Sequence, residues 1–132
     1  MSEIQLSLPL VDTSLLQSSR EQVVNLLAQD LDFHDQESNY ASHNFHSFPA
    51  KFPPQLPRLF IDTLTRPGDL VLDPMQGSGT TILEALLSGR RAIGFDIDPL
   101  SLLITQVKIT PLEPLMVLQA SKDIVRKASI AF

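Results

Sequence analysis

The sequence predicts an α/β fold whose centre is a parallel βαβ unit. Two short apolar runs, at residues 70–72 and 92–95, have the pattern of strands buried on both faces of a sheet. Residues 79–88, between them, have helical spacing and are followed by Gly89, a residue type that commonly ends helices. A strand, a helix and a second strand in this order indicate two parallel strands joined by a helix.

Length and composition indicate a single globular domain. The chain has 132 residues, of which 43% are hydrophobic, and this is enough for one core. Residues 1–40 hold seven acidic residues against one arginine, whereas the remainder is close to neutral. We therefore divide the chain into an acidic N-terminal arm and helix, 1–40, and a folded domain, 41–132. Cysteine is absent, which excludes disulfides and thiolate metal sites.

The sequence has no clear signal for secretion, for membrane insertion or for a strongly basic surface. The N-terminus has neither a positively charged region nor an apolar stretch long enough for a signal peptide, and no apolar run has the length of a membrane span. We therefore expect a cytoplasmic protein. A strongly basic surface, typical of nucleic-acid binding, is also absent, so a nucleic-acid substrate would have to be held mainly by other residues.

The N-terminal elements are predicted from capping residues and prolines. Residues 1–13 form a loose arm, and Ser18 with Glu21 matches a capping box that begins a helix over 19–31. Residues 32–50 have no clear period and are predicted as an extended loop. Pro57 suits the first turn of a short helix over 55–65.

The elements after this helix follow from turn and cap signals. Residues 66–69 form a turn ahead of the first strand. Asp98 and Pro99 match the N-cap and first position of a helix that extends to about Val107. After a proline-containing connector, residues 115–128 are predicted as a final amphipathic helix.

A glycine turn lies where the first strand ends, at the edge where parallel sheets bind ligands. Gly77 and Gly79 permit a tight turn and a close approach of a ligand to the backbone. Asp96 follows Gly79 by 17 residues, close to the spacing at which an acid accepts both hydroxyls of a ribose. Hydroxyl groups and free N–H groups at the start of the next helix suit a carboxylate or a phosphate; they belong to Ser78, Thr80 and Thr81.

Three kinds of nucleotide-binding site could account for this turn. A Walker A loop requires a lysine, which Gly79-Thr80-Thr81 lacks, and a dinucleotide loop requires a third small residue where Ile82 stands. S-adenosylmethionine also accounts for Asp73, which can pair with the amino group of that ligand. The alternative without a ligand is an ordinary strand-to-helix turn with acids that cap helices.

Three segments together resemble the amino-methylating DNA methyltransferases, the N4-cytosine and N6-adenine group: HSFPAKFPPQLPRLFI (46–61), RPGDLVLDPMQGSGTTILEALLSGRRAIGFDIDP (66–99) and LLITQVKITPL (102–112). They are most similar to site-specific enzymes with a His-x-Tyr-Pro-Ala-Lys-Phe segment ahead of an Asp-Pro-Phe-x-Gly-Ser-Gly-Thr-Thr loop. The resemblance implies a partial Rossmann-like class I methyltransferase fold with an incomplete sheet. It also implies S-adenosyl-L-methionine as cofactor and DNA as the substrate of the complete enzyme.

The resemblance assigns cofactor-binding roles by position. Asp96, followed by Ile97, matches the ribose-binding acid, and Lys51, Phe52 and Pro53 match the segment that closes over the methionine end of the cofactor. Met75 stands where the family usually has phenylalanine, so we expect looser packing of the loop. The residues that match the cofactor loop are Asp73, Pro74, Met75, Gly77, Ser78, Gly79, Thr80 and Thr81.

The catalytic tetrad of these enzymes, [D/N/S]-P-P-[Y/F/W], is not found; the nearest match, Phe52-Pro53-Pro54-Gln55, does not fit. By the family arrangement we expect the tetrad beyond the last residue of this chain, so the catalytic residues are unknown and the chain alone is expected to be inactive. We also expect one edge of the strand at 70–73 to be unpaired, so that the chain is either marginally stable alone or completed by a second polypeptide that supplies the missing strands. A split enzyme and an interrupted gene are both consistent with this expectation. The alternatives are a non-catalytic binding module derived from a methyltransferase and a fragment of an RNA methyltransferase.

Two further groups carry weaker predictions. His43 and His46 could begin a metal site, but without further ligands we expect ordinary loop histidines and no metal. The aromatic residues of the same loop could stack on a base, but packing onto the domain is favoured; they are Tyr40, Phe45, Phe48 and Phe52.

Overall fold

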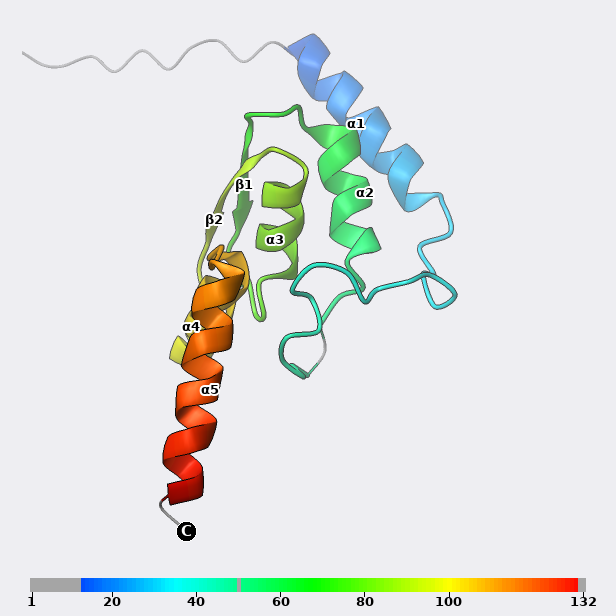
Figure 1. Cartoon of the computed structure of the whole chain (residues 1–132). Helices are drawn as coiled ribbons and strands as arrows, with labels where there is room; N and C mark the ends of the chain where they lie inside the picture. Colours follow the sequence, from blue (N-terminus) through cyan, green and yellow to red (C-terminus); the bar gives the residue numbers. More distant parts are fainter. Residues whose placement is uncertain (1–12, 50, 131–132) are drawn as a thin grey trace, which may run out of the picture.

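The computed structural model describes residues 13–49 and 51–130 of the chain. Most of the predicted loose arm lies outside the described residues. The elements in chain order are α1 (Thr13–Leu27), α2 (Gln55–Leu64), β1 (Leu70–Asp73), α3 (Thr80–Leu87), β2 (Arg91–Gly94), α4 (Pro99–Ile109) and α5 (Pro114–Ile130) (Figure 1).

The predicted βαβ unit is confirmed. β1 and β2 pair in parallel, from Leu70 opposite Arg91 to Asp73 opposite Gly94, and α3 is the helix that connects them. The helices form a layer in which α3 packs against the strands, α2 packs against α3, and α1 packs against α2 (Figure 1). The core lies within this layer and at its contact with α4; its buried apolar residues are Leu26, Ile61, Ile82, Leu83, Ala85 and Ile104.

The prediction that both strands are buried on both faces is wrong. Exposure alternates along each strand, so that Leu72 is 61% exposed while its neighbour Val71 is half-buried. The reason is that α3 covers only one face of the sheet, and no described element packs on the other. We call this other face the open sheet face, which consists of Leu70, Leu72, Ile93 and Phe95.

The first helix differs from the prediction at both ends. α1 begins at Thr13, so Ser18 lies inside the helix and the predicted capping box is wrong. The helix ends at Leu27 rather than at Leu31, because the chain tightens there: the Gln29 N–H donates to the Leu26 carbonyl oxygen at 3.1 Å. The predicted loop at 32–50 contains turns and bends but neither helix nor strand among its described residues.

The later elements agree more closely with prediction. α2 and α3 begin and end within one residue of the predicted bounds, and Gly89 follows α3 with a φ of 73°, as expected for the glycine after a helix. Asp98 caps α4 by accepting a hydrogen bond from the Leu100 N–H at 2.9 Å, but α4 continues two residues past Val107.

α5 stands apart from the other helices. It extends away from the sheet and the helical layer, and all of its described side chains are exposed (Figure 1). It was predicted as an ordinary amphipathic helix, yet its apolar residues meet no described element that covers them. In the described part of the chain, no helix has both the length and the apolar character needed to cross a membrane.

Candidate functional site

The tips of the two strands are joined by backbone hydrogen bonds. The Phe95 N–H donates to the carbonyl oxygen of Asp73 at 2.9 Å, and the Gln76 N–H donates to the carbonyl oxygen of Phe95 at 3.0 Å. The chain that leaves β1 is therefore held directly against the chain that leaves β2. This places the glycine turn, residues 74–79, and Asp96 at the same edge of the sheet, as the sequence predicts.

Asp96 is bonded to the glycine turn itself. Its Oδ2 accepts from the Gly77 N–H at 2.8 Å, and its Oδ1 accepts from the Asp98 N–H at 2.9 Å. Hydrogen bonds from the backbone of Asp98, and then of Gly77, lower the pKa of Asp96 below its ordinary value. An ionised carboxylate has about four acceptor positions, so this one can still accept hydrogen bonds from a ligand.

The two glycines of the turn have different neighbours. Gly79 has a φ of 75°, and a Cβ there would lie 2.5 Å from the Thr105 side chain, so a larger residue would collide with α4. A Cβ on Gly77 would lie 3.5 Å from Cε1 of Phe48, which means that the Phe48 ring covers this part of the turn. Gly94 is a third restricted position, since a Cβ there would overlap the side chain of Gln76.

Two side chains of α4 donate hydrogen bonds to the glycine turn. The Lys108 ammonium donates to the Ser78 carbonyl oxygen at 2.9 Å, and the Thr105 hydroxyl donates to the Gly77 carbonyl oxygen at 3.3 Å. Lys108 is buried, and this burial, together with repulsion from Lys51, lowers its pKa. These two side chains fix the turn so that its carbonyl groups face α4.

A small cavity of about 70 Å³ lies against the turn. Gln76, which was not predicted, lines it together with Phe48, one of the loop aromatic residues considered above. Among the predicted cofactor-binding residues, the structure gathers eight around it: Lys51, Phe52, Asp73, Met75, Gly77, Ser78, Thr80 and Thr81. Five do not line it: Pro53, Pro74, Gly79, Asp96 and Ile97, the last of which is fully exposed.

This cavity is smaller than the roughly 300–1,000 Å³ of sites that enclose a ligand of ordinary size. The segment that carries Phe48, Lys51 and Phe52 forms one of its walls. A nucleoside could therefore occupy the site only if this segment shifts away from the turn.

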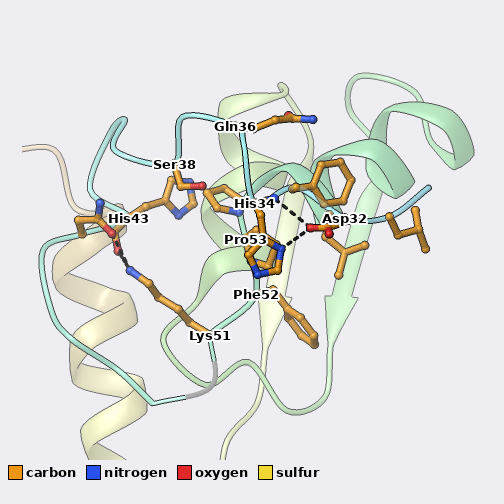
Figure 2. Close-up of a pocket in the computed structure, with 13 residues that line it drawn as sticks. Asp32, His34, Gln36, Ser38, His43, Lys51, Phe52 and Pro53 are labelled. Carbon is orange, nitrogen blue, oxygen red and sulfur yellow. Dashed lines mark hydrogen bonds and ion pairs between the residues drawn. The ribbon is translucent and has the colours of Figure 1, made fainter. Parts of the chain in front are cut away.

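A larger cavity of about 490 Å³ shares Lys51 and Phe52 with the first. Figure 2 shows the residues that line this larger cavity. Its polar groups are largely bonded to one another. The Lys51 ammonium donates to Asn44 Oδ1 at 2.6 Å and to the His43 carbonyl oxygen at 3.1 Å, and His34 pairs with Asp32. We place the candidate site at the smaller cavity, because its polar groups converge from strand tips and a helix start.

A buried histidine–glutamate pair was not predicted from the sequence. His43, considered above as a loop histidine or a metal ligand, is buried and bonded to Glu84 of α3. A charged residue between Leu83 and Ala85, in a helix with no other charged residue, was the signal that could have revealed this pair. No three histidine, cysteine or acidic side chains lie close enough to hold a metal ion in the part of the chain that the structure describes.

Comparison with known proteins identifies the family. A model for the N6 and N4 amino-methyltransferases, described as DNA methylase, matches residues 18–106. The chain belongs to this family. The resemblance inferred from the motifs is thereby confirmed.

Two relatives are type II methyltransferases, and this chain spans less than a quarter of the length of either. M.MjaII of Methanocaldococcus jannaschii is 39% identical over 83 residues, which are 63% of this chain and 16% of that protein. M.MvaI of Kocuria varians is 34% identical over 99 residues, which are 73% of this chain and 22% of that protein. The solved structure of the PvuII cytosine-N4-specific DNA methyltransferase matches with a TM-score of 0.51 and 28% identity, over 69% of this chain and 35% of that one. The partial methyltransferase fold predicted from the sequence is confirmed by this likeness.

Proposed function

We propose that this chain is the S-adenosylmethionine-binding part of a DNA amino-methyltransferase that modifies cytosine N4 or adenine N6. The observation that carries the proposal is the hydrogen bond between Gly77 and Asp96, which brings a glycine turn and an ionised acid together at the tips of two parallel strands. Membership of the DNA methylase family supports the same conclusion.

The residues at the turn fit the chemistry of this cofactor. Asp96 would accept the ribose hydroxyls, and Asp73, whose Oδ1 also accepts from the Met75 N–H at 3.1 Å, would pair with the amino group. The buried Ser78 hydroxyl has no hydrogen-bond partner among the described residues and lines the cavity, so it can serve a polar group of the ligand. Lys51, with Phe52 and Pro53, would lie at the methionine end.

The cofactor, when bound, supplies an electrophilic methyl group on a positively charged sulfur. The chain contributes position and charge, since it holds carboxylates on either side of the turn and excludes water with the segment that carries Phe48 and Phe52. No residue of this chain is proposed to act on the target base. DNA recognition and the catalytic tetrad would come from elsewhere in the complete enzyme.

A second polypeptide segment is proposed to complete the sheet. An apolar groove of about 340 Å³ lies between α2 and β1 and is lined by Phe60, Leu64, Leu70 and Leu72, among others. In the described part of the chain, β1 pairs with β2 alone. An exposed apolar strand edge of this kind is a template for pairing with another strand. We therefore propose that a strand of a polypeptide with the tetrad occupies the groove.

Calorimetric titration of S-adenosylmethionine tests the cofactor assignment. We expect binding by the wild-type chain and a loss of roughly 1–3 kcal/mol, or about 5- to 150-fold in Kd, for Asp96→Ala, because a charged hydrogen-bond acceptor for the ligand is removed. Asp96→Asn, which retains an acceptor for Gly77, separates loss of the ligand contact from disturbance of the turn. Asp123→Ala, at an exposed position of α5, should bind like wild type. Equal affinity for Asp96→Ala and wild type would overturn the assignment.

Transfer of labelled methyl groups distinguishes the remaining alternatives. The chain alone should transfer none, and transfer to unmethylated DNA should appear only with a polypeptide that carries the tetrad. Transfer to RNA instead of DNA would favour the RNA methyltransferase. Cofactor binding without transfer under either condition would favour the non-catalytic module.

A further inference from the structure

A buried polar cluster connects α3 to the irregular segment between α1 and α2. Glu84 lies in the middle of α3 and is 0% exposed, and His43 lies in the irregular segment and is 2% exposed. The two residues are 41 positions apart in the sequence. Neither of them lines the cavity at the glycine turn.

One carboxylate oxygen of Glu84 accepts hydrogen bonds from both Tyr40 and His43. Glu84 Oε1 accepts from the Tyr40 hydroxyl at 2.8 Å and from His43 Nε2 at 2.6 Å. The rings of Tyr40 and His43 also meet edge to face, with centroids 5.0 Å apart. A carboxylate can only accept, so Nε2 of His43 carries the proton of this hydrogen bond.

The charged groups around Glu84 do not fully offset the free-energy cost of burying its carboxylate. Arg58 of α2 is 4.0 Å from Oε2, which has no hydrogen-bond partner among the described residues. Burial lowers the pKa of His43, which favours the neutral ring, and the nearby Lys51 and Lys108 act in the same direction while Glu84 opposes them. A buried carboxylate in this setting is expensive compared with an apolar residue, and such groups can instead determine which arrangement a segment adopts.

From this cluster the contacts lead to the wall of the cavity. The carbonyl oxygen of His43 accepts from the ammonium of Lys51 at 3.1 Å, so the chain from 43 to 51 is closed into a loop. That loop carries Phe48, whose ring lies against Gly77, and it ends at Lys51 and Phe52, which line the cavity. We call residues 44–49 and 51–52 the covering segment.

We propose that Glu84 is a positioning residue: through Tyr40 and His43 it anchors the covering segment over the cavity at the glycine turn. The anchor holds the start of the segment to the most buried helix of the fold, so that Phe48 and Lys51 return to the same place when the segment closes over a ligand. The inference deepens the proposed function, on which it rests only in taking that ligand to be S-adenosylmethionine.

Hydrogen exchange of the full chain without ligand tests the anchor independently of the cofactor. Tyr40→Phe removes one hydroxyl, and Glu84→Gln retains the size of the side chain but not its charge. In both variants we expect amides of the covering segment to exchange about tenfold faster, because a local opening loses one or two buried hydrogen bonds. The amides of β1 and β2 should keep their wild-type rates. Glu113→Gln, at an exposed glutamate, is the matched control and should change neither region.

Two results would overturn the anchor. One is wild-type exchange of the covering segment in both variants, and the other is an equal acceleration in β1 and β2, which would indicate a general loss of stability. The urea midpoint of each variant identifies a general loss directly. Tyr40→Phe keeps the test valid if Glu84→Gln fails to fold.

Cofactor binding then tests the consequence. The Kd of S-adenosylmethionine should rise about 5- to 20-fold in Tyr40→Phe, although Tyr40 does not line the cavity. If wild type does not bind S-adenosylmethionine, the proposed function fails while the exchange result still decides the anchor. If wild type binds and Tyr40→Phe binds equally well, the positioning role is wrong and the cofactor assignment stands.

Discussion

α3 and α5 are both helices with many apolar residues, but the molecule uses them differently. α3 has eight residues, and five of them are buried, including an acid; α5 has 17 residues, and none of its described side chains is buried. α3 packs against both strands, α2 and α4, whereas α5 extends into solvent (Figure 1). Apolar content therefore does not by itself place a helix in the core; the surfaces available to pack against the helix do.

The largest expected difference in stability is between truncating a leucine in α3 and truncating a leucine in α5. Leu83→Ala in α3 is expected to lower the free energy of unfolding by about 2–5 kcal/mol, because it leaves a cavity in the core. Leu118→Ala in α5 should change it by no more than about 0.5 kcal/mol, since this side chain is half exposed and uncovered. Urea unfolding measures both. Comparable losses would mean that α5 is packed against the domain in solution.

The next effect concerns the turn ahead of α3. Gly79→Ala should cost about 2–4 kcal/mol, because the new Cβ collides with Thr105 and the backbone has a positive φ. Gly68→Ala is the matched control: φ is 90° there, but nothing lies within 4 Å of the added Cβ, so only the backbone cost of about 1–2 kcal/mol remains. In a Thr105→Ala background, where the collision is relieved, the stability cost of Gly79→Ala should fall to that of Gly68→Ala. A loss at Gly68 as large as that at Gly79 would contradict the packing of α4 against the turn.

The smallest effect is a dependence of stability on pH that arises from His43, the partner of Glu84 in α3. The pKa of His43 is lowered in the folded chain, so the unfolded chain binds more protons below the ordinary value of 6.5. The contribution of His43 to stability is therefore complete above that pH and declines as the pH falls through it. Glu84, Lys51 and Lys108 act on the charge of the His43 ring, and Tyr40 packs against it; these groups set how far the decline extends. Arg58 acts indirectly, through its ion pair with Glu84.

His43→Gln removes the titrating group and should flatten the curve of unfolding free energy between about pH 7 and 5 relative to wild type. His46→Gln, at an exposed position of the same loop, is the control and should leave the slope unchanged. A wild-type slope in His43→Gln would mean that the acid sensitivity arises from other groups.

Sequence reasoning was most accurate where a few neighbouring residues decide the structure. Gly89 ends α3 and Asp98 with Pro99 begins α4, because caps and turns depend on the conformation and hydrogen bonds of adjacent residues. It failed at α1, where Ser18 and Glu21 have the spacing of a cap but lie inside a helix that starts earlier. A short motif says where a cap can form, not which of several candidate positions the chain uses.

The amino-acid order alone was enough to predict the βαβ unit, the glycine turn at the tip of β1 and the acid after β2. These follow from hydrophobic periodicity, turn chemistry and the rule that parallel strands end at one edge. Packing in three dimensions was needed to show that one face of the sheet is open and that α5 is uncovered. It was also needed to show that Glu84 lies inside the fold with His43 and Tyr40 bonded to it. Burial is a property of what packs against a residue, and those partners are distant in the chain.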